Sequence, residues 1–115
     1  MAIYKNNVPG TIDSLKKYIS DNVGALGFSI SAEEEDEGVV GNTKYYIAGF
    51  ERFGYISQNR VSLNITLLEY DGGVKVIATS LGGSAGAIFK INTWSEENFL
   101  SDFADLIERY KKEAN

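Results

Sequence analysis

Two stretches with helical periodicity, one near each end of the chain, enclose a longer stretch whose apolar residues alternate with polar ones. The first follows Pro9-Gly10, and the apolar residues on its one face are Ile12, Leu15, Ile19 and Val23. The second follows the capping-box pair Thr93 and Glu96, and its apolar face carries Phe99, Phe103, Leu106, Ile107 and Tyr110. A chain with this pattern has to bury both stripes against the segment between them.

Alternation with a period of two predicts strands in the middle of the chain. The clearest strand runs from Arg60 to Tyr70, and Asp71-Gly72-Gly73 predicts a tight turn after it. The other predicted strands are Phe28–Ala32, Val39–Glu51, Val74–Ser80 and, after a glycine-rich connector, Ala87–Ile91. We expect the acidic run Glu33–Glu37 to form the solvated end of the first hairpin, where its charge resists edge-to-edge pairing.

Short links between consecutive strands imply an antiparallel sheet. We therefore predict an α+β fold in one domain, residues 1–115: a two-layer sandwich in which a four- to five-stranded antiparallel meander carries the N-terminal and C-terminal helices on one face. If Ala2–Lys5 adds an edge strand, the order of elements becomes β-α-β-β-β-β-(β)-α. This order resembles helix-grip and TATA-binding-protein-like folds, in which a curved sheet wraps a C-terminal helix.

The chain contains no histidine and no cysteine. Histidine is the side chain that titrates near neutral pH unaided, and cysteine is the thiol nucleophile and the soft metal ligand. Without them, a Ser-His-Asp triad, a thiol redox site and an ordinary zinc site are excluded. No carboxylate or lysine motif replaces them, so we expect neither a metal nor a cofactor, and the composition disfavours an enzyme.

The charge balance, 16 acidic against 11 basic residues and a formal net charge of −5, disfavours a nucleic-acid partner and an anionic membrane surface. No stretch approaches the roughly 20 apolar residues that span a bilayer. The N-terminal residues Met1–Lys5 do not have the pattern of a signal peptide. We therefore expect a cytoplasmic protein with no nucleic-acid and no membrane partner.

The second predicted strand is apolar on both sides, because Tyr46, Ala48 and Phe50 alternate with Tyr45, Ile47 and Gly49. One side has to pack on the helices. The other side then presents an apolar cluster, to which the neighbouring strands add Leu68, Tyr70 and Ile77. Such a patch on a small protein is typical of a partner surface, although scattered surface hydrophobes are also normal.

Two groups of residues are candidates for binding a ligand. Aromatic side chains could line a pocket for a small apolar ligand, namely Tyr46, Phe50, Phe53 and Tyr55, although the same residues could simply be core. The glycine-rich loop could cradle an anion with help from a lysine, through Gly82, Gly83, Ser84, Gly86 and Lys90. That loop matches neither a P-loop nor a dinucleotide fingerprint, so a flexible turn, or a strand that another backbone approaches closely, is the favoured explanation.

The acidic residues have structural explanations as well. The run Glu33–Glu37 lacks the oxygen spacing of a calcium-binding loop. Glu69 falls in phase with the inward residues of its strand, where an unpaired charge would be costly, so we expect Arg52 or Arg60 as its partner.

The segment Gly82–Trp94, which reads Gly-Gly-Ser-Ala-Gly-Ala-Ile-Phe-Lys-Ile-Asn-Thr-Trp, resembles part of a small family of uncharacterised bacterial proteins. The resemblance implies membership of a family without a known function and assigns no role to any residue. Three hypotheses follow from the sequence. They are a non-enzymatic module that self-associates through its sheet, a binder of a small apolar ligand between the sheet and the C-terminal helix, and an enzyme or binder of an anionic ligand at the Gly82–Gly86 loop.

Overall fold

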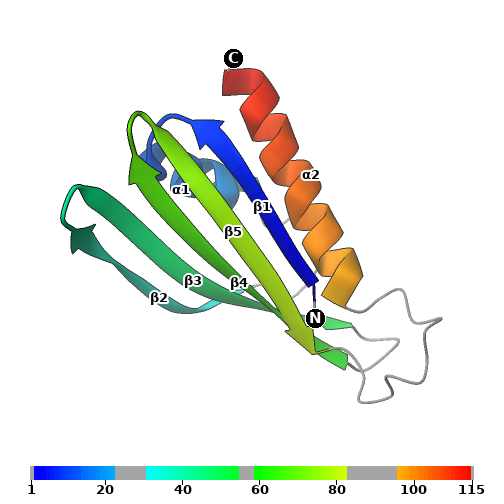
Figure 1. The fold of residues 1–115 in the computed structure, drawn as a ribbon. Helices are drawn as coiled ribbons and strands as arrows, with labels where there is room; N and C mark the ends of the chain where they lie inside the picture. Colours follow the sequence, from blue (N-terminus) through cyan, green and yellow to red (C-terminus); the bar gives the residue numbers. More distant parts are fainter. Residues whose placement is uncertain (1, 23–30, 55–58, 83–95, 115) are drawn as a thin grey trace.

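Five strands and two helices make up the described part of the chain in the computed structural model, residues 2–22, 31–54, 59–82 and 96–114 (Figure 1). In chain order they are β1 (Ala2–Pro9), α1 (Ile12–Asn22), β2 (Ser31–Val40), β3 (Thr43–Gly54), β4 (Asn59–Tyr70), β5 (Gly73–Gly82) and α2 (Glu96–Ala114). The predicted strand Ala87–Ile91, the capping residue Thr93 and the start of the predicted strand Phe28–Ala32 lie outside the described residues.

The strands form one antiparallel sheet in the order β1-β5-β4-β3-β2. Strands β2 to β5 are a meander of hairpins, and β1 returns from the start of the chain to pair with β5. The α+β class, the antiparallel meander and the two helices are therefore confirmed. The edge strand that was expected over Ala2–Lys5 is present and continues to Pro9.

The position predicted for the first hairpin turn is wrong. The acidic run Glu33–Glu37 lies inside β2, with a bulge between Ala32 and Glu34, and the turn is at Gly41-Asn42. Gly41 has a φ of +62°, a conformation that glycine adopts without steric cost, and this residue sets the turn. Strand β2 tolerates its charges because it is an edge strand, and Glu34 and Asp36 reach solvent.

The turn between β4 and β5 is where the sequence predicts it. Asp71 and Gly72 both have positive φ, 52° and 79°, as a two-residue type I′ hairpin requires. The register that follows pairs Tyr70 with Gly73 and Leu67 with Val76.

The buried side chains of β1, β3, β4 and β5 lie on the same side of the sheet, the side that faces the helices. This core comprises Val8, Ile12, Leu15, Ile19, Tyr46, Ala48, Phe50, Val61, Leu63, Ile65, Leu67, Val74, Val76, Ala78, Phe99, Leu100, Phe103, Leu106, Ile107 and Tyr110. The helices also contact each other, since the rings of Tyr18 and Tyr110 lie 5.1 Å apart and Ser14 Oγ is 2.9 Å from the Tyr110 hydroxyl. Both predicted stripes therefore cover a common face (Figure 1).

Polar contacts hold α2 along β1. The Tyr4 hydroxyl and Asn6 Nδ2 both donate hydrogen bonds to Glu108 Oε2, at 3.1 and 2.9 Å. Lys111 Nζ donates to Asn6 Oδ1 at 3.0 Å. Burial raises the pKa of the Tyr4 hydroxyl, and the Glu108 carboxylate raises it further, so this tyrosine stays neutral as a donor. These contacts fix the direction of α2 relative to the edge strand.

The N-terminus of α1 is capped by a residue far away in the sequence. Ile12 N–H donates to Glu69 Oε1 at 2.8 Å, and Ser14 N–H donates to Thr11 Oγ1 at 3.2 Å. Glu69 lies on the helix-facing side of β4, as its phase predicts, and accepts a hydrogen bond at the α1 N-terminus. The arginines expected as its partners have their backbone at the other end of β4, where Arg52 pairs with Val61 and Arg60 with Phe53. A carboxylate is favourable there because the first N–H groups of a helix lack partners and carry partial positive charge.

We expect Glu69→Ala to lower the free energy of unfolding by about 1–2 kcal/mol, because it leaves the half-buried Ile12 N–H without its acceptor. Glu69→Gln is the matched control, since the amide oxygen can still accept the bond, and its loss should be smaller. Urea denaturation followed by circular dichroism measures both. Equal stability of the alanine variant and the unsubstituted protein would contradict the capping role.

Candidate interaction surface

The side of the sheet opposite the helices, which we call the outer face, is covered by no other element of the described chain (Figure 1). Side chains on this face alternate along each strand with those of the core. Its apolar members among the described side chains are Ile3, Val40, Tyr45, Ile47, Leu68, Tyr70, Ile77 and Leu81. The sequence left open which side of β3 faces the core, and in the structure Tyr46 lies on the core side and Tyr45 on the outer face.

One cross-strand row runs through the middle of the outer face. From the β1 edge to the β2 edge it reads Lys5, Ile77, Thr66, Ile47 and Asp36. The row is basic at one end, apolar near the centre and acidic at the other end. Ile47 is 45% exposed, which is high for an isoleucine in an interior strand of a sheet.

The rows on either side each add one charged side chain. On the β1 and β5 side, Lys75 stands next to Asn7 and Leu68. On the β2 side, Glu34 stands next to Gly49. The outer face therefore carries positive charge along one edge and negative charge along the other.

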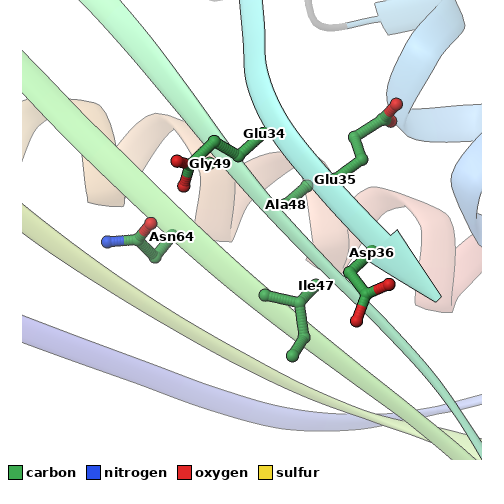
Figure 2. A pocket seen from close by; sticks show the side chains of 7 residues that line it. All are labelled: Glu34, Glu35, Asp36, Ile47, Ala48, Gly49 and Asn64. Atoms are coloured by element: carbon green, nitrogen blue, oxygen red, sulfur yellow. The ribbon is translucent and has the colours of Figure 1, made fainter.

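A shallow groove of about 450 Å³ crosses the acidic side of the sheet (Figure 2). The residues that line it are Glu34, Glu35, Asp36, Ile47, Ala48, Gly49 and Asn64. The groove exists because Gly49 has no side chain, and a Cβ there would lie 3.2 Å from Asn64 Oδ1. Within the described ranges, no three acidic side chains come together in a way that could hold a metal ion.

Tyr45 fixes the geometry of the acidic edge. Its ring lies over Gly38, where an added Cβ would be 2.9 Å from the ring, and its hydroxyl donates to Asp36 Oδ2 at 3.0 Å. This hydrogen bond raises the pKa of the exposed Tyr45 hydroxyl, because the bonded carboxylate favours the neutral phenol. The arrangement holds the Asp36 carboxylate on the outer face beside Ile47.

The other side of the same edge is anchored to α1. The buried Tyr46 hydroxyl donates to Glu35, Lys16 Nζ lies 4.6 Å from the centre of the Tyr46 ring, and Lys16 pairs with Glu37 at 2.9 Å. Burial and then the bond to Glu35 raise the pKa of Tyr46 well above its ordinary value. Alternate acids of β2 thus have different surroundings. On the helix-facing side, Glu35 bonds to Tyr46 of β3 and Glu37 to Lys16 of α1, while Glu34 and Asp36 reach the outer face.

The structure separates the ligand-binding residues that the sequence suggests. Tyr46 and Phe50 are 6% and 8% exposed and belong to the core beneath the helices. Tyr46 pairs with Leu67 and Gly82 pairs with Val61, so the two lie at opposite ends of β4. Phe53 lies in β3 and pairs with Arg60 of β4, and the side chain of Phe53 is outside the described part. The remaining candidates also lie outside the described residues, namely Tyr55, Gly83, Ser84, Gly86 and Lys90.

Sequence reasoning missed the charged residues of the outer face. It placed Glu34 and Asp36 in a turn, and it gave no role to Lys5 or Lys75. The signal that could have found them is the Gly41-Asn42 pair, since a turn at that position puts Asp36 opposite Ile47.

The features above define an α+β domain with helices on one face of an antiparallel sheet and an open face of mixed character. Residues 1–111 match the family of unknown function DUF6054, and the chain belongs to that family. The resemblance of Gly82–Trp94 to an uncharacterised family is thereby confirmed, and the match extends over nearly the whole chain. Bacterial origin and likeness to helix-grip folds stay predictions. A comparison with curated proteins gave no match.

Neither α1 nor α2, the helices of the described ranges, is long and apolar enough to cross a membrane.

We expect Tyr46→Phe to reduce the sensitivity of the fold to alkaline pH. The pKa of Tyr46 is raised in the folded state, so its contribution to stability is complete below the ordinary tyrosine value of about 10 and is lost as pH rises above it. Between pH 8 and 11 the unsubstituted protein should lose about 1 kcal/mol more than the phenylalanine variant.

Urea denaturation at both pH values measures this difference, and Glu35→Gln should give an intermediate result because Tyr46 stays buried in that variant. An equal loss of unfolding free energy between pH 8 and 11 in the unsubstituted protein and in the Tyr46→Phe variant would contradict the interpretation.

Proposed function

We propose that the protein is a non-enzymatic interaction module of the cytoplasm that self-associates through the outer face of its sheet. The observation that carries the proposal is the open face itself. Ile3 is 57% exposed, and Ile47, Tyr70 and Leu81 are each 45% exposed, with Leu68 and Ile77 half-buried among them. An apolar patch of this kind on a small domain is typical of a protein–protein contact.

The alternative route to self-association, strand pairing at a sheet edge, is disfavoured at both edges. The β2 edge carries consecutive acids, Glu33–Glu37, and pairing it with a second β2 would bring like charges together. At the other edge, α2 packs on β1, and Pro9 at the end of β1 has no N–H to donate to another strand. The open face is therefore the better contact surface.

The perturbed tyrosines support a structural rather than a catalytic role for the titrating groups. Tyr4 bonds to Glu108 on α2, Tyr45 bonds to Asp36, and Tyr46 bonds to Glu35. Each of these hydroxyls is committed to a contact between two elements of the fold. An interaction module needs no titrating group of its own, and the composition without histidine and cysteine suits one.

We expect Ile47→Lys to convert a dimer into a monomer, because it places a charge at the centre of the contact. Val39→Lys is the matched control: Val39 is also exposed, at 63%, but belongs to the other side of the sheet edge, opposite Lys44. Size-exclusion chromatography with light scattering measures the mass, and thermal unfolding shows that both variants fold. An unsubstituted protein that stays monomeric at millimolar concentration would overturn the proposal.

A further inference from the structure

We infer that two copies of this chain pack outer face to outer face about a two-fold axis that runs nearly parallel to β4, so that the lysine edge of each copy meets the acidic edge of the other. The inference rests on the proposed self-association and specifies its geometry. It depends on how charge is distributed across the outer face, an observation separate from the exposure of the apolar side chains.

The symmetry of a face-to-face pair limits the choices. An isologous dimer has a two-fold axis, and for two sheets stacked face to face that axis lies between them, parallel to both. If it follows the strands, each position on one side of β4 meets the mirrored position of the second copy. If it crosses the strands, each edge of the sheet meets the same edge of the second copy.

The central row is complementary to itself under the first arrangement. Lys5 on β1 faces Asp36 of the other copy, and Ile77 on β5 faces Ile47 of the other copy. Thr66 on β4 lies at the axis and meets its own counterpart. The arrangement joins opposite charges at both ends of the row and apolar side chains between them.

The neighbouring row through Leu68 adds an apolar contact at this axis. Leu68, also on β4, meets Leu68 of the second copy close to the axis. In the rows on either side of the central row, the axis places Lys75 opposite Tyr45 of the second copy and Glu34 opposite Ile3, so the contact between opposite charges belongs to the central row. With the axis across the strands, Lys5 would stand near Lys5 and Asp36 near Asp36, and like charges in a contact are destabilising.

The size of the face suits a stable pair. Five strands at about 4.8 Å spacing and roughly nine residues of length give an area of roughly 700 Å² per copy. A standard interface buries about 800 Å² per partner, so the outer face alone supplies nearly all of that area.

Cross-linking distinguishes the two axes. Because the sequence contains no cysteine, each variant carries a single reactive thiol. The variants are K5C, D36C and T66C, each treated with a short bismaleimide that spans the roughly 10 Å between stacked sheets. We expect Thr66→Cys to cross-link to itself, and Lys5→Cys to cross-link with Asp36→Cys in a mixture at least ten times more than either does alone. Self-cross-linking of Lys5→Cys or Asp36→Cys at or above the level of the mixture would overturn the geometry.

A charge swap provides an independent readout. We expect K5E and D36K each to weaken the dimer by at least tenfold in Kd, and the K5E/D36K double variant to recover most of the loss, because the pair is restored with reversed sign. Analytical ultracentrifugation measures the three constants, and circular dichroism checks that each variant folds. A double variant weaker than both single ones would count against the pair.

The two proposals fail in different ways. A monomeric unsubstituted protein overturns self-association, and the geometry with it. A dimer that is lost in Ile47→Lys but shows the wrong cross-linking pattern leaves self-association standing and overturns only the axis.

Discussion

One constraint organises this molecule: the sheet has to bury a single face. In β1, β3, β4 and β5 the buried residues share one phase, from Val8 in β1 to Tyr46 in β3, and both helices lie against that phase. The apolar stripes of α1 and α2 have no other surface large enough to cover them. The open outer face follows directly from this layering, because both helices lie on the same side of the sheet.

Polar contacts between distant segments then fix how the layers sit on each other. Glu69 on β4 caps α1, Glu108 on α2 accepts bonds from β1, and Tyr46 on β3 joins Glu35 on the edge strand. Each contact links two elements whose apolar packing alone would allow them to slide. Non-directional burial supplies most of the driving force, and these directional bonds select the arrangement.

The sequence predicts the parts that follow from local rules. The structure contains the two predicted helices with their apolar spacing, the Asp71-Gly72 turn and a β3 strand that is apolar on both sides. The acidic run was misplaced because charged residues are poor strand formers, and edge position overrides that preference. The capping of α1 by Glu69 could not be read from the chain, since it joins residues 57 positions apart. The charge distribution of the outer face was hidden for the same reason, because it depends on which strands are neighbours.

The place of β1 in the sheet has a consequence for how the chain folds. Strands β2 to β5 pair with their sequence neighbours, but Ala2 pairs with Ser80, so β1 cannot pair until β5, much later in the sequence, is available. Local hairpins form quickly. Contacts between segments far apart in the sequence form slowly, because closing the long loop between them costs entropy before the contact stabilises the chain. The core closes later still, because α2, which follows β5 in the chain, supplies six of its buried side chains.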